Sequence, residues 1–215
     1  MPQLIETLRT EPDGSIPLLA LHMRRLRASA ELLGYVCPVC DIGGALKRCA
    51  QSLPGEIHRL RLLLWRTGLY TIETSPLPPQ HAHLQVGLSD TLLDADEPYL
   101  RHKTTHRPVY TPAGTWLAQH PDLFDVLFFN QRGELCEGSR SNVYLRLADG
   151  KWYTPPVESG LLPGVQRSAL LESGAVQERT LSRHDLNTAQ GIRLSNALRG
   201  WFDVSLASTR FVHTP

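Results

Sequence analysis

The stretch Ser75-Pro76-Leu77-Pro78-Pro79-Gln80 divides the chain into a shorter and a longer part. Its three prolines remove three backbone amide donors, so the stretch cannot continue a β-ladder. Regular patterns of apolar residues lie on both sides of it. We therefore interpret it as a hinge between two α+β lobes, residues 1–78 and 79–215.

The shorter lobe has the pattern of two helices on a small antiparallel sheet. Apolar residues from Leu19 to Leu33 recur at spacings of three and four, which is typical of an amphipathic helix. The expected elements are a strand at 4–9, a helix at 17–33 ended by Gly34, a helix that Asp41 caps and that runs to about 53, and strands at 57–66 and 69–74.

The longer lobe is expected to be larger and rich in strands. The predicted strands are residues 84–89, 125–129, 142–147, 151–154, 176–181, 191–195 and 201–205. The predicted helices are residues 109–119, 164–172 and 185–190.

Composition excludes several classes of protein. A formal charge of +1 gives no global field that favours nucleic acid or an anionic membrane. No apolar run is long enough to span a bilayer, and the first residues lack the pattern of a signal peptide. We therefore expect a cytoplasmic protein with a packed core. Four cysteines are too few for a disulfide scaffold.

The segment Arg101-His102-Lys103-Thr104-Thr105-His106-Arg107 surrounds one lysine with basic residues. Positive neighbours disfavour the ammonium form, and a Schiff-base nucleophile requires the neutral amine. Alternatively, the segment is a solvated basic loop.

The segment Glu137-Gly138-Ser139-Arg140-Ser141-Asn142 follows a hairpin signal at residues 130–133. A carboxylate at a strand end could stabilise a protonated ring nitrogen. The same residues are also typical of an ordinary turn before a strand.

The segment Leu161-Leu162-Pro163-Gly164-Val165-Gln166-Arg167 is a glycine-containing turn that opens a helix. The first amides of a helix have no intrahelical partner, so Val165 and Gln166 could bind a phosphate through backbone N–H groups. A plain helix start with proline at its edge has the same pattern.

The segment Leu194-Ser195-Asn196-Ala197-Leu198-Arg199-Gly200 is a strand end that breaks into a turn of small residues. Ser195 and Asn196 could donate to the same phosphate, or they could cap a loop.

Cys37, Cys40 and Cys49 raise a further alternative, a zinc-bound interaction module. A structural zinc site needs four ligands, and the second cysteine pair is missing. We expect free thiols and no metal site.

Together and in this order, these segments resemble the class IV, fold-type IV pyridoxal-phosphate enzymes, which include branched-chain and D-amino-acid transaminases and aminodeoxychorismate lyase. The resemblance extends from Ile5 to about Val204 and is closest to the lyase. It implies a two-lobed α+β fold and the cofactor pyridoxal 5′-phosphate. It also implies a homodimer and a functional link to aminodeoxychorismate synthase.

The resemblance assigns roles to individual residues. Lys103 would bind the cofactor covalently, and Glu137 would pair with the pyridine nitrogen, with Asn142 in the same motif. The cofactor phosphate would be bound by Arg25, which lies in the pattern Leu21-His22-Met23-Arg24-Arg25-Leu26. Further phosphate contacts would come from Gly164, Val165, Gln166, Ser195, Asn196 and Ala197.

Two departures from the family pattern affect the expected activity. Transaminases of this group carry a tyrosine five residues after the lysine, whereas this chain has Pro108 there and Tyr110 two residues on. Gln166 replaces the usual phosphate-binding threonine. The departures favour a lyase that converts 4-amino-4-deoxychorismate to 4-aminobenzoate and pyruvate in folate biosynthesis.

Substrate contacts in such a lyase would come from Arg107, Tyr110 and Arg140, because the substrate carries two carboxylates. The alternatives are a class IV transaminase that uses the same residues, and a non-catalytic protein whose basic segment binds RNA or another anion.

Overall fold

The computed structural model describes residues 2–79 and 84–212. These residues form two compact units. The first contains residues 2–79 together with 102–106, and the second contains residues 84–101 and 107–212. The chain therefore returns briefly to the first unit after entering the second. The sequence-based division at residue 78 did not include this return.

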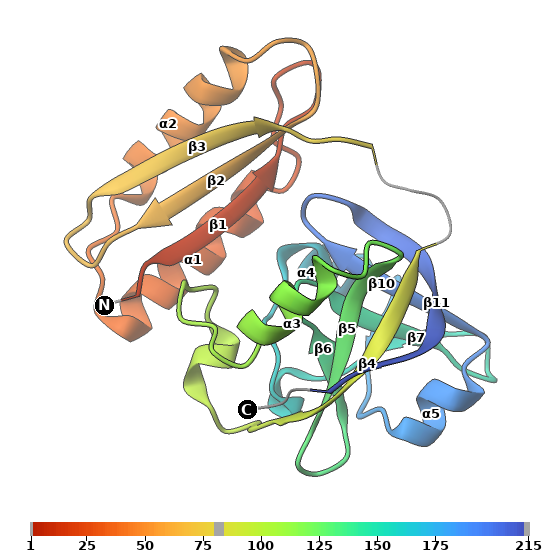
Figure 1. The fold of residues 1–215 in the computed structure, drawn as a ribbon. Helices are drawn as coiled ribbons and strands as arrows, with labels where there is room; N and C mark the ends of the chain where they lie inside the picture. Colours follow the sequence, from red (N-terminus) through yellow and green to blue (C-terminus); the bar gives the residue numbers. More distant parts are fainter. Residues whose placement is uncertain (1, 80–83, 213–215) are drawn as a thin grey trace. The chain divides into compact units, whose positions relative to one another are not determined.

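The first unit is a three-stranded antiparallel sheet with two helices on one face (Figure 1). The strands are β1 (Leu4–Arg9), β2 (His58–Leu64) and β3 (Tyr70–Pro76), in that spatial order. The helices are α1 (Leu19–Leu33) and α2 (Val39–Gln51). Leucines of alternating positions in β1 and β2 meet the apolar stripes of both helices and form one core.

The ends of these helices have identifiable causes. Gly34 adopts a left-handed conformation with φ of 70° and ends α1, as the sequence predicted. The prediction that Asp41 caps the second helix is wrong, because α2 begins at Val39 after Pro38. Asp41 lies in the first turn and accepts a hydrogen bond from the Tyr70 hydroxyl at 2.6 Å.

The proline stretch is partly a strand. Ser75 and Pro76 belong to β3 and pair with Arg59 and His58, so the prediction that the ladder cannot include them is wrong. β3 is an edge strand, where a proline without N–H can be accommodated on the unpaired side. Residues 77–79 lie outside the strands, and Gln80 lies outside the described residues.

Residues 102–106 extend the sheet of the first unit beside β1. Thr104 forms an isolated antiparallel bridge with Leu4. The Ile5 N–H donates to the Lys103 carbonyl at 2.8 Å, and the Thr105 N–H donates to the Gln3 carbonyl at 2.9 Å. The segment is thus held by backbone pairing.

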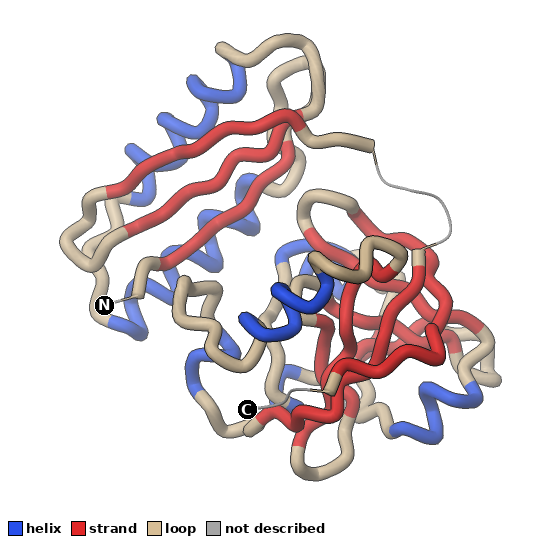
Figure 2. The backbone as a smooth tube through the Cα atoms, viewed as in Figure 1, coloured by secondary structure: helices blue, strands red, loops and turns tan. Residues whose placement is uncertain are grey.

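The second unit is built on an eight-stranded mixed sheet that curls on itself (Figure 2). The spatial order is β6-β5-β4-β11-β10-β7-β8-β9, and β4 pairs in parallel with both β5 and β11. The strands are β4 (Gln85–Leu93), β5 (Leu123–Asn130), β6 (Leu135–Gly138), β7 (Asn142–Arg146), β8 (Trp152–Thr154), β9 (Gln177–Glu178), β10 (Gly191–Asn196) and β11 (Gly200–Phe211).

Three α-helices and two 3-10 turns accompany this sheet. They are η1 (Pro98–Arg101), α3 (Thr111–Leu117), η2 (Val157–Ser159), α4 (Val165–Glu172) and α5 (Arg183–Thr188). The start of α5 is a capping box between Ser182 and Asp185. α3 packs on β5, and α4 packs beside β10.

Three strands of the second unit differ from prediction. The expected strand at 176–181 is reduced to Gln177–Glu178, and the Leu181 carbonyl instead accepts from Leu135 N–H. The strand expected at 201–205 runs on to Phe211, because its second half pairs with β4 after its first half pairs with β10. The short strand β6 was not among the predicted strands.

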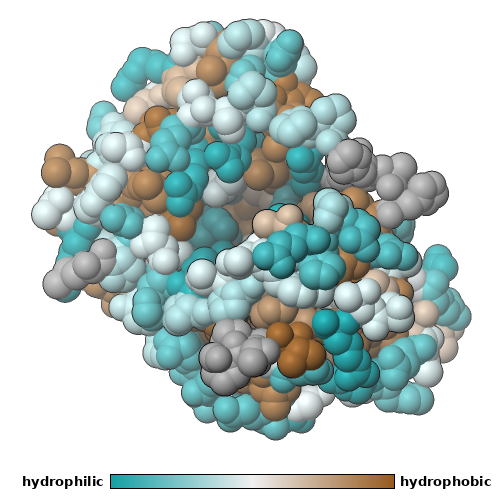
Figure 3. All heavy atoms as spheres, viewed as in Figure 1, coloured by the Kyte–Doolittle hydropathy of each residue, from teal (hydrophilic) through white to brown (hydrophobic). Residues whose placement is uncertain are grey.

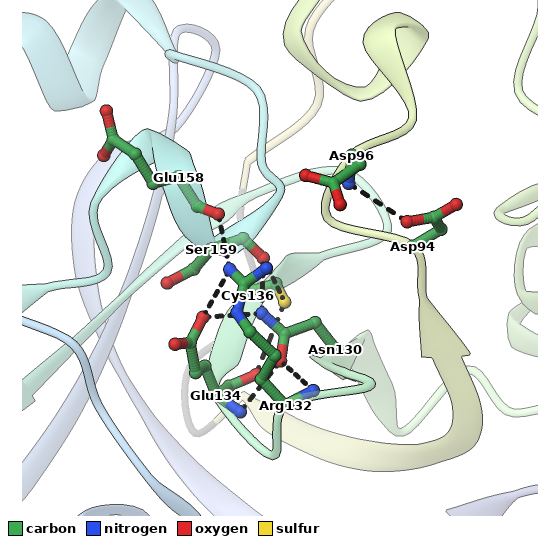
Figure 4. Close-up of polar contacts among 8 residues, drawn as sticks. All are labelled: Asp94, Asp96, Asn130, Arg132, Glu134, Cys136, Glu158 and Ser159. Atoms are coloured by element: carbon green, nitrogen blue, oxygen red, sulfur yellow. Dashed lines mark hydrogen bonds and ion pairs between the residues drawn. The ribbon is translucent and has the colours of Figure 1, made fainter.

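The turn between β5 and β6 is held by a dense polar cluster (Figure 4). The buried Asn130 amide donates to Glu134 Oε2 at 2.7 Å and to the Ser159 carbonyl at 2.9 Å, and its oxygen accepts two backbone N–H groups of the turn. Arg132 donates to Glu134 and to the Glu158 carbonyl, and the Cys136 thiol donates to the Ser159 carbonyl. The cluster joins η2 to the strand that carries Glu137.

None of the helices in the part of the chain that the structure describes is long and apolar enough to cross a bilayer. On the face drawn in Figure 3, hydrophilic residues lie among hydrophobic ones.

We expect Asn130→Ala to lower the free energy of unfolding by about 2–4 kcal/mol, because it removes four hydrogen bonds around a buried turn. Urea denaturation measures the change. The matched control is Asn187→Ala, since Asn187 is exposed on α5. Equal stability of the two variants would contradict the role given to Asn130.

Candidate active site

A buried charged group lies on the helix-covered face of the first unit. Glu6 alternates with Leu4 and Leu8 on β1 and is 1% exposed. Its carboxylate accepts from Arg25 Nε at 2.9 Å and from Arg25 Nη2 at 2.6 Å, in a bidentate ion pair. The His22 Nδ1 atom lies 2.6 Å from Glu6 Oε2. Two side chains of α1 therefore converge on one carboxylate of β1.

Burial and charge oppose each other at this group. Burial alone raises the pKa of Glu6, but the Arg25 guanidinium and the His22 hydrogen bond outweigh it and lower the pKa to about 2. Burial lowers the pKa of His22, although its Glu6 partner acts in the opposite direction. His22 thus serves as a neutral donor to an ionised carboxylate.

The lysine predicted to be catalytic lies in the segment paired with β1. Side chains alternate along a paired segment. Thr104, which pairs with Leu4, is fully buried, and the His102 ring lies 3.0 Å from the Ser29 hydroxyl of α1. Lys103, which lies between them, is half-buried, and its positive charge contributes to the lowered pKa of His22 on α1. This ordered segment differs from a solvated basic loop.

In the second unit, Glu137 is the last but one residue of β6 and is 4% exposed. The Tyr110 hydroxyl donates to Glu137 Oε1 at 2.7 Å, and the Asn142 amide lies 3.3 Å from Oε2. Asn142 opens β7 and also donates to the Leu162 carbonyl at 2.9 Å. The sequence-predicted residues Glu137, Asn142 and Tyr110 are therefore in direct contact.

Arg107 completes this group. Its guanidinium donates to the Ser139 carbonyl at 2.6 Å and lies 4.6 Å from the centre of the Tyr110 ring. Burial, together with the charge of Glu137, raises the pKa of Tyr110 well above its usual value, so the phenol remains a hydrogen-bond donor. The group therefore combines a carboxylate, a protonated phenol and a guanidinium.

The glycine turn before α4 lies directly against Asn142. Gly164 is the N-cap residue of α4 and has no side-chain cap, and Val165 and Gln166 are the first helical residues. A Cβ atom at position 164 would overlap the Asn142 amide oxygen and lie 3.2 Å from its Cγ. Only glycine lets this turn approach the motif that carries Glu137.

The last predicted phosphate loop follows β10. The buried Ser195 hydroxyl lies 2.7 Å from the Tyr144 hydroxyl, and Asn196 accepts from the N–H groups of Leu198 and Arg199. Ala197 lies in the turn that Asn196 organises. The Asn196 side chain thus adopts the loop-capping role that the sequence left open, while α4 packs beside this strand.

The Arg140 side chain packs on β5. It is exposed, stacks 4.9 Å from the centre of the Phe124 ring and donates to the Phe124 carbonyl. Arg25 and Lys103 belong to the first unit, and the other predicted site residues belong to the second.

The cysteines do not form a ligand cluster within residues 2–79 and 84–212. Cys37, Cys40, Cys49 and Cys136 are free, and no group of three His, Cys, Asp or Glu side chains there could hold a metal ion.

Two buried acids of these sites were not selected from the sequence. Glu6 and Asp125 are almost completely buried. The sequence indicates both residues, since each acid interrupts the apolar pattern of a strand, Glu6 in Leu4–Arg9 and Asp125 in Leu123–Asn130. A buried charge must be paired or hydrogen-bonded, which makes such an interruption informative.

Comparison with known proteins identifies the family. The family model described as "Amino-transferase class IV" matches residues 3–207, nearly the whole chain. The chain belongs to the class IV aminotransferases. Its fold is accordingly the fold-type IV architecture, as the sequence predicted.

Relatives with different named activities match this class IV chain. It is 30% identical over 194 residues to the "Putative aminodeoxychorismate lyase" of Schizosaccharomyces pombe, covering 87% of this chain and 83% of that protein. It is 33% identical over 207 residues to the "Probable branched-chain-amino-acid aminotransferase" of Thermotoga maritima, covering 91% and 73%. A crystal structure of a "Putative amino-acid aminotransferase" from Mesorhizobium loti matches with a TM-score of 0.88 and 36% identity, covering 96% of this chain and all of that chain.

Class IV aminotransferases are pyridoxal-phosphate-dependent enzymes, which confirms the predicted cofactor and enzyme class. The residues of this chain fit that group. Glu137 would offer a buried carboxylate to a ring nitrogen, and the helix N-terminus at Gly164, which has no Cβ, would offer backbone donors to a phosphate.

We expect the Glu6 cluster to make the stability of the protein acid-sensitive. The pKa of Glu6 is lowered in the folded state, so its contribution is complete above about pH 4.5 and is lost as the pH falls towards 2. A shift of this size corresponds to about 3 kcal/mol. Glu6→Gln should therefore be less stable than the wild type at pH 7, and the difference should shrink on acidification.

Urea denaturation between pH 7 and pH 3 tests this expectation. The control is Glu31→Gln, because the ion pair of Glu31 with Arg27 on α1 is exposed. A stability difference between wild type and Glu6→Gln that does not change with pH would contradict the assignment.

Proposed function

We propose that the chain is a pyridoxal-phosphate-dependent lyase that converts 4-amino-4-deoxychorismate to 4-aminobenzoate and pyruvate, a reaction of folate biosynthesis. Membership of class IV supports the cofactor chemistry. The relative from Schizosaccharomyces pombe carries the name of this lyase. The proposal then has to distinguish a lyase from a transaminase.

The observation that carries this distinction is the hydrogen bond between Tyr110 and Glu137. Transaminases of the group that the sequence resembles carry a tyrosine five residues after the lysine, where this chain has Pro108. Tyr110 is the next tyrosine along the chain, and its hydroxyl is bound to Glu137 at 2.7 Å. The Tyr110 hydroxyl therefore already donates to the Glu137 carboxylate. We take this as support for the lyase over the transaminase.

The proposed roles follow from the chemistry of each side chain. When bound, pyridoxal phosphate supplies an electron sink for the electron pair that is left on the substrate carbon when its proton is removed. Lys103 would hold the cofactor covalently and, once displaced by the substrate amine, would take the proton from the carbon that carries that amine. Glu137 would hold a proton on the pyridine nitrogen.

The phosphate of the cofactor would be bound by side chains and backbone. Arg25 would contribute charge while Glu6 fixes its guanidinium, and the N–H groups of Val165 and Gln166 would donate from the start of α4. Ser195, Asn196 and Ala197 would form the neighbouring loop.

Arg107 is the proposed partner of one substrate carboxylate, with Tyr110 beneath it. Its guanidinium is oriented by the Ser139 carbonyl and by the Tyr110 ring. Arg140 is a less favourable candidate for binding a substrate carboxylate, because its guanidinium donates to the Phe124 carbonyl.

The second candidate function is an amino-acid transaminase. The relative from Thermotoga maritima and the structure from Mesorhizobium loti favour it by their names. Both candidates use Lys103 and Glu137, so only substrate specificity separates them. A dimer is expected for either.

The test is a product assay with the purified protein supplied with pyridoxal phosphate. With 4-amino-4-deoxychorismate we expect equimolar pyruvate and 4-aminobenzoate. With branched-chain or D-amino acids and a keto acid, we expect no exchange of the amino group. The reverse pattern would reject the lyase and support the transaminase.

We expect Lys103→Ala to reduce turnover of the active substrate by about 1,000-fold or more, since the covalent attachment and the general base are both lost. The control is Lys151→Ala, because Lys151 is exposed in the turn before β8. Full activity of Lys103→Ala would exclude Lys103 from the reaction.

A further inference from the structure

A buried aspartate lies behind the loop that links Glu137 to Asn142. Asp125 is on β5 and has no exposed surface. Its Oδ1 atom accepts from the N–H groups of Val126 and Ser139 at 2.8 and 2.9 Å and from the Ser139 hydroxyl at 2.6 Å. Its Oδ2 atom accepts from the Arg140 N–H at 3.2 Å and from the Ser141 hydroxyl. One carboxylate thus binds three consecutive residues of the loop.

Gly138 allows this close packing. A Cβ atom at position 138 would overlap the Asp125 carboxylate and would lie 2.6 Å from the Ser141 hydroxyl. The glycine of the Glu-Gly motif is therefore required by the space that Asp125 occupies. The loop is tied to β5 on one side, and its Gly138 N–H donates to the Ser141 carbonyl at 2.7 Å on the other.

The loop in turn fixes two residues of the proposed active site. Glu137 is the residue immediately before it, and the Ser139 carbonyl inside it accepts from Arg107 at 2.6 Å. Arg107 stacks on Tyr110, which donates to Glu137. A displacement of the loop would therefore move the carboxylate and the guanidinium together.

We propose that Asp125 is a positioning residue, which holds the loop 138–141 so that Glu137 and Arg107 are preset for the cofactor ring and for a substrate carboxylate. This inference rests on the proposed function. Asp125 acts only through the loop, because all five of its donors belong to residues 126 and 139–141. Preset groups bind more tightly because less ordering is required on binding.

The first test uses the protein without added substrate. Asp125→Asn preserves the shape of the side chain but replaces one acceptor oxygen by a donor that faces other donors. We expect hydrogen exchange at the Ser139 and Arg140 amides to be at least about tenfold faster than in the wild type. Unchanged exchange at these amides would overturn the inference.

The second test is titration of the same variant with pyridoxal phosphate, followed by absorbance. We expect the dissociation constant to rise about tenfold or more and the visible band of the bound cofactor to shift, because Glu137 is displaced from the ring nitrogen. In the substrate assay, KM should rise as well as kcat fall, since Arg107 is displaced with the loop. An unchanged dissociation constant and spectrum would overturn the inference.

Two further variants keep the test decisive. Ser139→Ala removes one hydroxyl donor and leaves Asp125 in place, so it should give the same changes to a smaller degree even if Asp125→Asn does not fold. The matched control is Asp149→Asn, because the Asp149 carboxylate also accepts a backbone N–H but lies in an exposed turn. Equal behaviour of Ser139→Ala and Asp149→Asn would overturn the inference.

Failure of the proposed function would give a different result. Wild-type protein that binds no pyridoxal phosphate would reject the proposed function, and the inference with it. Wild-type binding with normal turnover, together with variants that bind and turn over normally, would reject the inference alone.

Discussion

The backbone pairing of residues 102–106 with β1 is the constraint on which the proposed chemistry depends. Two hydrogen bonds, from Ile5 to the Lys103 carbonyl and from Thr105 to the Gln3 carbonyl, attach this short segment to the sheet of the first unit. The segment has few residues, so its register determines the face on which each side chain emerges. Thr104 is buried, the His102 ring lies 3.0 Å from the Ser29 hydroxyl of α1, and the charge of Lys103 acts on His22 of the same helix.

Buried carboxylates organise both units by the same physical rule. A carboxylate removed from water must be matched by charges or hydrogen-bond donors. Glu6 is matched by Arg25 and His22, whereas Asp125 is matched by backbone amides and hydroxyls. In each case the matching groups include, or directly adjoin, residues proposed to contact the cofactor. Because each buried carboxylate requires these donors close to it, it restricts the positions of the residues that supply them.

The sequence was most informative where the signal is local. The strand at Leu4–Arg9, the end of α1 at Gly34 and the start of α4 after Gly164 depend on neighbouring residues, and all three were predicted within a residue or two. The four motifs at residues 101–107, 137–142, 161–167 and 194–200 led to the right family, because their order along the chain is more specific than any one of them.

The sequence was least informative where pairing between distant segments decides the structure. The extension of β11 to Phe211 and the pairing of Pro76 with His58 depend on partners far along the chain. The return of residues 102–106 to β1 depends on a segment almost a hundred positions earlier. Glu6 and Asp125 were not predicted as site residues because their partners lie elsewhere in the chain, on α1 and in residues 139–141, although an acid inside an apolar strand pattern is visible in the sequence.

The most direct measurement is mass spectrometry of peptides from protein that has been incubated with pyridoxal phosphate and reduced with borohydride. The account predicts a pyridoxyl-phosphate adduct on one peptide, with the modification on Lys103. An adduct confined to Lys47 or Lys151, or its absence from the peptide that contains residue 103, would contradict it.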